Sequence, residues 1–317
     1  MIPFNVPTTD LQERFQSLQN EKTKYICPNY AASSNYTHCG REDWEDRLKR
    51  VMKFRKETLL YFYDWTGSLD LPSDVMSTAA FIFDKYLSTF LPQYIRGEIK
   101  RCDKHGLIGL SCFFIAIKSL LSWDEIDHIV NRFGKRSREV FLADVETKVL
   151  KALKWQIVYT SPMSIIQDLM TLLPQYHNYG YAGALDAFKH SVLKEASHLI
   201  KLTVVNYGFN IRYPPLNVAL AVLMLSIEMC SSAHQPLCKL IRPMAYLSYA
   251  FEKFGLGCLS FGDEEVVKCR KDIIYILKQG KSSYNKRSDT NSPTAVAEMH
   301  TSRGTTKKRN SFVAKTA

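Results

Sequence analysis

Two long apolar stretches constrain the fold of this chain more than any other feature of its sequence. The stretches Leu107–Ile117 and Leu216–Ile227 contain few side chains that would favour contact with water. A helix that is apolar on every side must be covered on all sides by other elements. Both stretches are shorter than the about 20 residues needed to cross a bilayer. The sequence therefore predicts two buried central helices, each inside its own group of helices.

Apolar spacing and helix-start signals predict further helices around each central one. Ser122 and Glu125 have the spacing of a capping box, and Pro162 follows Ser161 as a proline at a first helical position follows an N-cap. No Asn-Gly or Asp-Gly hairpin turn occurs. The sequence therefore predicts an all-α fold with two tandem groups of five helices. The helices are expected at 44–66, 73–90, 104–121, 123–133 and 137–154, and then at 162–173, 184–207, 215–230, 236–253 and 263–279.

Polar segments flank the predicted helices. Residues 1–43 are rich in Asn, Ser and Thr, and we expect them to be loosely ordered with a short helix near 11–18. The first group is expected to occupy 44–160 and the second 161–279. Residues 280–317 are expected to form a disordered basic tail. This tail holds eight Lys or Arg residues and two acids, so more than half of the net charge of +11 lies in it.

The cysteines and acidic residues indicate neither a metal centre nor an active site. The eight cysteines form no C-x-x-C pair, and we expect them to be reduced. Only His38, Cys39 and Cys27 cluster like metal ligands, and they lack a fourth partner. The acidic cluster at 124–127 is explained by helix capping and the helix dipole. No catalytic motif stands out, so we expect a chain that is not an enzyme and needs no cofactor.

A series of short motifs carries a resemblance to a known family. They are Phe54-Arg55, Ala79-Ala-Phe-Ile-Phe-Asp84-Lys-Tyr-Leu-Ser88, Lys104-His-Gly-Leu107-Ile-Gly109, Phe114-Ile115-Ala116-Ile117-Lys118, Val145-Glu146, Val149-Leu150-Lys-Ala-Leu-Lys-Trp155 and Tyr213-Pro-Pro-Leu-Asn-Val-Ala-Leu-Ala221. In order and spacing these motifs resemble the cyclin family over residues 44–279, most closely over 54–162. The resemblance implies an N-terminal cyclin box followed by a second cyclin-like fold.

The resemblance assigns structural roles to four of these residues. Arg55 and Asp84 lie on consecutive predicted helices among apolar neighbours, where a guanidinium needs a carboxylate with bidentate geometry. By analogy with the family they form an internal ion pair that fixes the first helix of the box to the second. Leu107 and Ala116 are expected to be core residues of the cyclin box.

The resemblance also implies a binding site for a kinase. In cyclins the residues that correspond to Lys118 and Glu146 hydrogen-bond to the backbone of the kinase. Ile115, Leu150 and Trp155 are expected to supply the apolar part of this contact. A second interpretation remains open, in which Lys118 and Glu146 form only an internal surface pair, worth less than about 1 kcal/mol.

The implied function is that of a regulatory subunit. The chain is expected to bind and activate a cyclin-dependent kinase, as a heterodimer, in control of the cell cycle and cell division, without direct membrane or nucleic-acid contact. The alternative is a nucleic-acid-binding transcription factor of the same fold, or a transcription-associated cyclin. The basic residues that favour this alternative are Lys49, Arg50, Lys53, Lys56, Arg132, Lys135, Arg136 and Arg138.

The chain also departs from the family pattern. Glu57 and Thr58 stand where cyclins usually have apolar residues of a substrate-recruiting patch, so we do not expect substrates to dock there. The segment 119–121 reads Ser-Leu-Leu, where the family often has two acids. In the tail, 307–309 is a Lys-Lys-Arg run that suggests a location in the nucleus as well as the cytoplasm. Ser292 and Ser311, in the same tail, are possible phosphorylation sites by their flanking residues.

Overall fold

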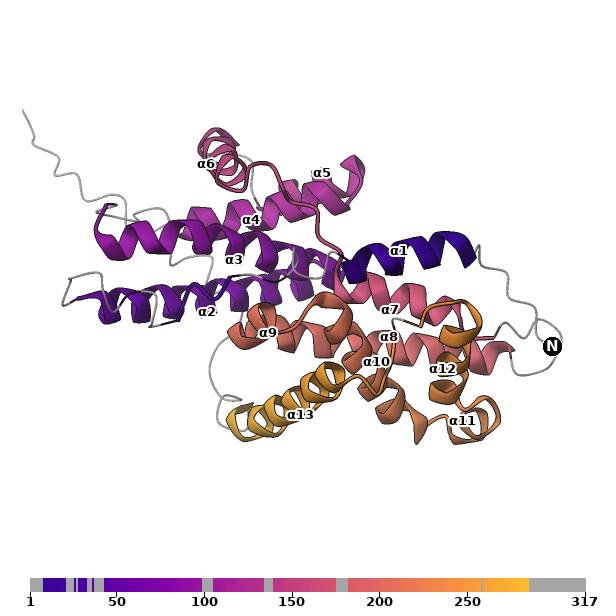
Figure 1. Cartoon of the computed structure of the whole chain (residues 1–317). Coiled ribbons are helices and arrows are strands. Elements are labelled where there is room, and N and C mark those ends of the chain that lie inside the picture. The colour runs from indigo at the N-terminus through magenta and orange to yellow at the C-terminus, as the bar shows by residue number, and fades with distance from the viewer. Residues whose placement is uncertain are drawn as a thin grey trace, which may run out of the picture. The chain divides into compact units, whose positions relative to one another are not determined.

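The structure is a computed structural model that describes residues 8–20, 26, 28–32, 36, 43–98, 105–133, 139–174, 182–257 and 259–284 (Figure 1). The regular secondary structure of these residues is helical, and no strand occurs among them. The predicted all-α fold is therefore confirmed. The chain divides into two compact units, Met1–Ile273 and Ile274–Ala317.

The first group of helices surrounds α4 (His105–Leu120). This helix packs against every other helix of its group, and its residues from Ser111 to Ile117 are buried. The apolar stretch predicted to be central is thus the core of the group. The other members are α2 (Trp44–Ser68), α3 (Ser73–Arg96), α5 (Trp123–Phe133) and α6 (Glu139–Ala152).

The second group surrounds α10 (Pro215–Ser231). This helix packs against α7, α8 and α12, and most of its residues from Pro215 to Ile227 are buried. The tandem arrangement of two helix groups is therefore confirmed. The other members are α7 (Pro162–Thr171), α8 (Ala182–Val205), α9 (Tyr207–Arg212), α11 (Gln235–Ile241), α12 (Pro243–Lys253) and α13 (Glu264–Tyr284), of which α13 crosses the boundary between the two units.

One predicted helix, 236–253, is wrong as a single element. It is divided into α11 and α12 at Arg242, whose φ of 43° and ψ of 68° place it in the left-handed region. Pro243 disfavours the α conformation of the residue before it and lacks the N–H that a continuous helix would use. The predicted helix 184–207 likewise ends at Val205, and α9 follows as a separate short element.

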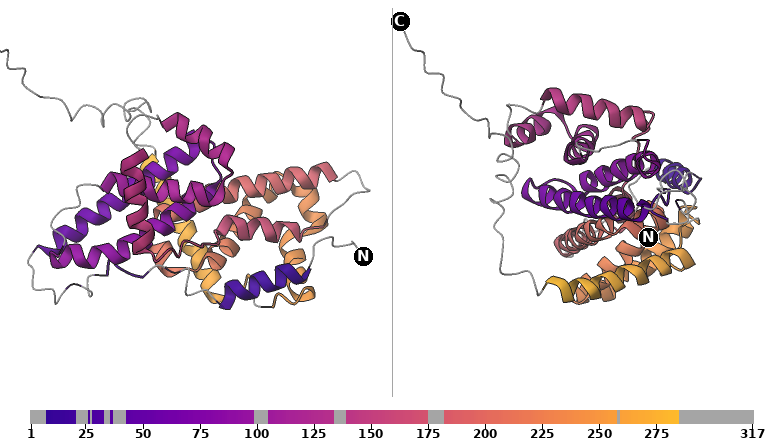
Figure 2. Two further views of the ribbon diagram at one scale, coloured as in Figure 1. Left: turned by 90° about the horizontal axis from the view of Figure 1, so that it is seen from above. Right: turned by 90° about the vertical axis from the view of Figure 1, so that its left-hand side faces the viewer.

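The short helix expected near residues 11–18 is present, and it is longer than predicted. Residues 8–20 form helix α1 (Thr8–Asn20), and its Phe15 is completely buried. Arg14 of α1 pairs with Asp168 at 2.8 Å and donates to Ser164 Oγ at 2.6 Å, which fixes α1 beside α7, as Figures 1 and 2 show. Tyr30 is also buried. These contacts join positions distant in the sequence, and a composition argument cannot detect them.

Some expectations concern residues outside the described ranges. These are the cluster of His38, Cys39 and Cys27, and nearly all of the basic tail, including Ser292 and Ser311. Within the ranges that the structure does describe, no group of His, Cys, Asp or Glu could hold a metal ion. No helix in those ranges combines the length and the apolar character needed to cross a membrane.

Candidate functional site

Lys118 and Glu146 form an ion pair at the surface of the first helix group. Lys118 lies in the last turn of α4, and its Nζ is 3.0 Å from Glu146 Oε1 and 2.7 Å from Oε2, on α6. The Lys118 side chain is 43% exposed and that of Glu146 12% exposed. The ammonium has three donors, of which the carboxylate takes two. The pair therefore places a strong donor and a strong acceptor side by side at the rim of the core.

The three residues predicted to supply apolar contact have different environments. Ile115 is 4% exposed and belongs to the core, so it offers little area to a partner. Leu150 is half-buried on α6. Trp155 is 63% exposed, just beyond the end of the helix. Trp155 thus presents most of the exposed apolar area of the predicted set.

The end of α6 holds Trp155 at the surface by its backbone. The Lys154 N–H donates to Lys151 O and the Trp155 N–H to Leu150 O, the pattern of a Schellman motif. Lys154 and Trp155 both have positive φ, 52° and 60°. Left-handed backbone costs an L-residue about 1–2 kcal/mol. The turn is therefore held in an unfavourable conformation that directs the chain away from the helix.

Further apolar residues close to this site in the sequence are also exposed, and the sequence motifs do not include them. Trp123 at the start of α5 is 78% exposed, Leu120 at the end of α4 is partly exposed, and Val158 beyond Trp155 is strongly exposed. Leu120 and Trp123 lie on either side of Leu121-Ser122, at a predicted helix junction where few side chains can be covered, and this position is a signal of exposure.

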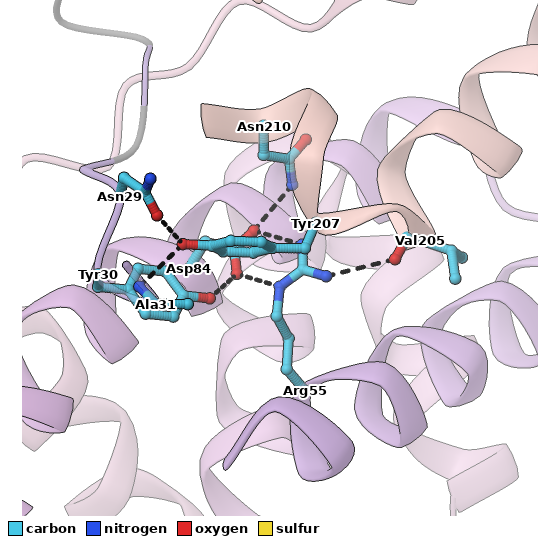
Figure 3. A network of polar contacts seen from close by, with 8 residues as sticks. All are labelled: Asn29, Tyr30, Ala31, Arg55, Asp84, Val205, Tyr207 and Asn210. Carbon is cyan, nitrogen blue, oxygen red and sulfur yellow. Dashed lines mark hydrogen bonds and ion pairs between the residues drawn. The ribbon is translucent and has the colours of Figure 1, made fainter. Parts of the chain in front are cut away.

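Arg55 on α2 and Asp84 on α3 are brought together in the buried interior. Arg55 Nε donates to Asp84 Oδ1 at 2.6 Å and Nη2 to Oδ2 at 2.8 Å, which is the bidentate geometry (Figure 3). Both side chains are almost completely buried. Burial by itself lowers the pKa of the Arg55 guanidinium, but the Asp84 carboxylate outweighs it, and the net pKa is raised. The Arg55 guanidinium therefore remains charged in the core.

The Asp84 carboxylate has two more donors, which the sequence did not reveal. Tyr30 Oη donates to Oδ1 at 2.6 Å, and Asn210 Nδ2 donates to Oδ2 at 2.8 Å. Arg55 Nη1 also donates to the carbonyl oxygen of Val205, at the end of α8, at 3.3 Å. Burial, and then the charge of Asp84, raise the pKa of Tyr30, so this phenol keeps its proton. The pair is thus the centre of a larger network.

The remaining residues of the predicted box are placed as follows. Ala116 is completely buried in α4, whereas Leu107 is half-buried. Thr58 is buried and faces Gly109 of α4, where an added Cβ would lie 2.6 Å from Thr58 Cγ2. Glu57 is exposed. At the two positions where cyclins usually have apolar residues of the substrate-recruiting patch, this chain therefore has an exposed charged residue, Glu57, and a buried residue that packs against α4, Thr58.

The basic residues that favoured nucleic-acid binding are partly neutralised where they are described. Lys49 Nζ lies 3.6 Å from Asp46 and 3.9 Å from Glu45, and Lys53 Nζ lies 3.9 Å from Glu57. These are exposed pairs along α2, of a kind that stabilises a helix weakly. The structure therefore adds no observation in favour of a nucleic-acid surface.

Comparison with known proteins identifies the family of the first helix group. Residues 18–158 match the family of the cyclin N-terminal domain. No curated protein matches the chain in sequence. A viral cyclin from herpesvirus saimiri has a similar structure, with a TM-score of 0.50 and 15% identity over 83% of this chain and 97% of that chain. The CAK complex of Chaetomium thermophilum bound to ATP-gamma-S gives a TM-score of 0.41 and 13% identity, over 88% of this chain and 92% of that chain. The fold is therefore that of a cyclin, and residues 18–158 belong to the family of the cyclin N-terminal domain.

Proposed function

We propose that this protein is a regulatory subunit that binds and activates a cyclin-dependent protein kinase. The observation that carries the proposal is the Lys118–Glu146 pair, a donor and an acceptor at the surface of a cyclin N-terminal domain. Both stand at the positions that resemble the kinase-binding Lys and Glu of cyclins. The chain itself performs no reaction in this proposal. It provides binding free energy that differs between two states of the kinase.

The mechanism follows from where such a contact acts on a kinase. A kinase is active when its mobile regulatory helix lies inward, so that a glutamate on that helix pairs with the lysine that holds the ATP phosphates. A cyclin domain docked on the helix stabilises the inward state and favours an ordered activation loop. Lys118 would donate to a backbone carbonyl of the kinase, and Glu146 would accept from a backbone N–H.

Apolar contact completes the proposed interface. Exposed aromatic side chains contribute most to binding when a partner covers them completely. Trp155 and Val158 are held at the surface just beyond the C-terminal end of α6, the helix that carries Glu146. We expect the kinase to cover these two residues, while the ion pair fixes the register of the contact.

The test is co-purification and a kinase assay with the variant Lys118→Ala/Glu146→Ala. The full-length wild-type chain is expected to retain a cyclin-dependent kinase and stimulate its activity. The double variant is expected to lose most of both, because each partner loses hydrogen bonds to a charged group, about 1.5–3 kcal/mol each. The site assignment is wrong if the double variant binds and activates as well as the wild type.

A matched control separates loss of the site from loss of a surface ion pair. Arg270 and Glu228 form a pair of similar length in the second helix group, with Nη2 2.7 Å from Oε2. Arg270→Ala/Glu228→Ala removes a comparable ion pair away from the proposed site. This control is expected to bind the kinase as the wild type does.

A role in the cell cycle and a location in the nucleus are further parts of the proposal. They rest on the family and on the basic run at 307–309. Imaging of a fluorescent fusion of the full chain, with and without Lys307→Ala/Lys308→Ala/Arg309→Ala, tests the location. The nuclear fraction is expected to fall in the variant, and an unchanged distribution would contradict the assignment of this signal.

A further inference from the structure

Three parts of the chain meet at the Asp84 carboxylate (Figure 3). Arg55 reaches it from α2 of the first helix group, and Asn210 from α9 of the second. Tyr30 reaches it from the segment that precedes the first group. The two oxygens accept four hydrogen bonds in all, two at each oxygen. The Asp84 carboxylate therefore has all four of its hydrogen bonds only when all three parts of the chain are in place.

The N-terminal segment also binds the second helix group directly. The Ala31 N–H donates to Tyr207 Oη at 3.0 Å, and this hydroxyl donates in turn to Asn29 Oδ1 at 3.0 Å. The rings of Tyr30 and Tyr207 meet edge to face, with centroids 5.2 Å apart. Residues 29–31 are thus held by three contacts with one residue of α9, in addition to the bond with Asp84.

Arg55 also joins the first helix group to the second. Its Nη1 donates to the Val205 carbonyl oxygen, one of the carbonyls that a helix end leaves without an intrahelical partner. Its guanidinium also lies 5.0 Å from the centre of the Tyr207 ring, a cation–π distance. The positive charge near the C-terminus of α8 is favourable for the helix dipole. The ion pair of the first group therefore also anchors the end of α8.

These contacts are coupled because they share one buried carboxylate. A charged group in the core is costly unless its hydrogen-bonding capacity is used. If residues 29–31 leave, Oδ1 loses one of its two donors, and the remaining contacts with Asp84 must adjust. If α9 moves, Oδ2 loses Asn210 and the segment loses Tyr207. Binding of residues 29–31 at Asp84 therefore favours binding of α9 there, and the reverse is also true.

We infer that residues 29–31 form a latch, which closes on the Arg55–Asp84 pair and holds α9 of the second helix group against the first. Tyr30 and Asn210 are the positioning residues of this latch, because each places its own element through the same carboxylate. The role assigned to Arg55 and Asp84 from sequence, the joining of two helices within one box, is thereby extended to the joining of three parts of the chain. This inference does not depend on the proposed kinase partner.

Hydrogen exchange of the full chain, followed by mass spectrometry, tests the latch. Tyr30→Phe removes only the hydroxyl that bonds to Asp84. Amide protection in residues 205–212 is expected to fall on the order of tenfold, although the substituted residue lies in a different part of the chain. Protection in α10 is expected to remain unchanged. If residues 205–212 exchange as in the wild type, or if all helices lose protection equally, the latch is excluded.

The reciprocal variant and a matched control complete the test. Asn210→Ala is expected to lower protection of residues 28–32 by a similar factor, because coupling between two sites acts in both directions. Tyr213→Phe is the control, since its hydroxyl donates to Asp272 Oδ2 at 2.7 Å within the second group. This control is expected to leave residues 28–32 unchanged. Exchange of residues 28–32 that responds to Tyr213→Phe and not to Asn210→Ala would overturn the inference.

Discussion

At the scale of single residues, Asp84 accepts hydrogen bonds from three different side chains, and this sets the cost of removing it. Asp84→Ala would strand the buried Arg55 guanidinium and leave Tyr30 and Asn210 without their acceptor. We expect a loss of about 3–5 kcal/mol in the free energy of unfolding, measured by urea denaturation. The control is Glu57→Ala, which removes an exposed partner 3.9 Å from Lys53 and should cost less than about 1 kcal/mol. Equal losses in the two variants would contradict the buried network.

Asp74, at the start of α3, gives a prediction about pH. Burial raises the pKa of this carboxyl from 3.8 to about 6, against a hydrogen bond from the Ser164 backbone that lowers it. Because the pKa is higher in the folded chain, the folded state holds the proton more tightly. The resulting stabilisation is complete below about pH 4 and is lost as the pH rises through about 6.

The comparison with Asp74→Asn isolates this effect. Asn carries no charge at any pH, so the variant should lack the fall in stability between pH 4 and 6. The difference in free energy of unfolding between variant and wild type is expected to increase by at most about 3 kcal/mol across this range. Denaturation at several pH values measures it. A difference that stays constant with pH would show that Asp74 is not buried as described.

The residues of the candidate site differ in how far the sequence could predict them. Arg55 and Asp84 stand among apolar neighbours on strongly periodic helices, so a buried charge that requires a partner is readable from the pattern. Tyr30 lies in a polar segment without periodicity, and Asn210 lies in a short helix of six residues. Nothing local indicates that either reaches Asp84, because the contact depends on the tertiary fold.

At the scale of elements, the close approach of α2 and α4 depends on Gly109. A Cβ at this position would lie 2.6 Å from Thr58 Cγ2, a distance that non-bonded carbons do not tolerate. Gly109→Ala is therefore expected to cost about 1–3 kcal/mol of stability through overpacking, although alanine is the better helix former. Thr58→Ser removes Cγ2 and should restore part of this loss in the double variant, as measured by a double-mutant cycle in urea. Additive effects would contradict the contact.

The positions of most helices follow from local signals, and the exceptions have identifiable causes. Periodicity, caps and prolines locate α2 to α8 and α10 within a few residues of their observed ends, apart from the far end of α3. That helix was expected to end at residue 90 but continues through Pro92 to Arg96. The split at Arg242 was missed because the helical pattern of apolar residues continues through Pro243. Local signals therefore locate helices better than they locate breaks.

At the scale of the whole molecule, the family domain begins well before the first helix expected from the sequence. It matches residues 18–158, whereas the first predicted group started at residue 44. The difference is consistent with the structure, because Tyr30 is buried and bonds to the central ion pair of the box. Tyr30 is thus part of the domain. The polar composition of residues 1–43 does not reveal this contact.

We propose that Lys118 and Glu146 bind a kinase and do not form only an internal ion pair. The most direct test exchanges the two charges, Lys118→Glu/Glu146→Lys, and titrates the full chain into the purified cyclin-dependent kinase that the wild type retains. An internal ion pair can form again after the exchange, so stability should change by less than about 1 kcal/mol. A kinase backbone would instead meet an acceptor in place of a donor, and affinity should fall about tenfold or more. If the exchanged variant binds as tightly as the wild type, the pair is only internal and the proposed kinase-binding site is contradicted.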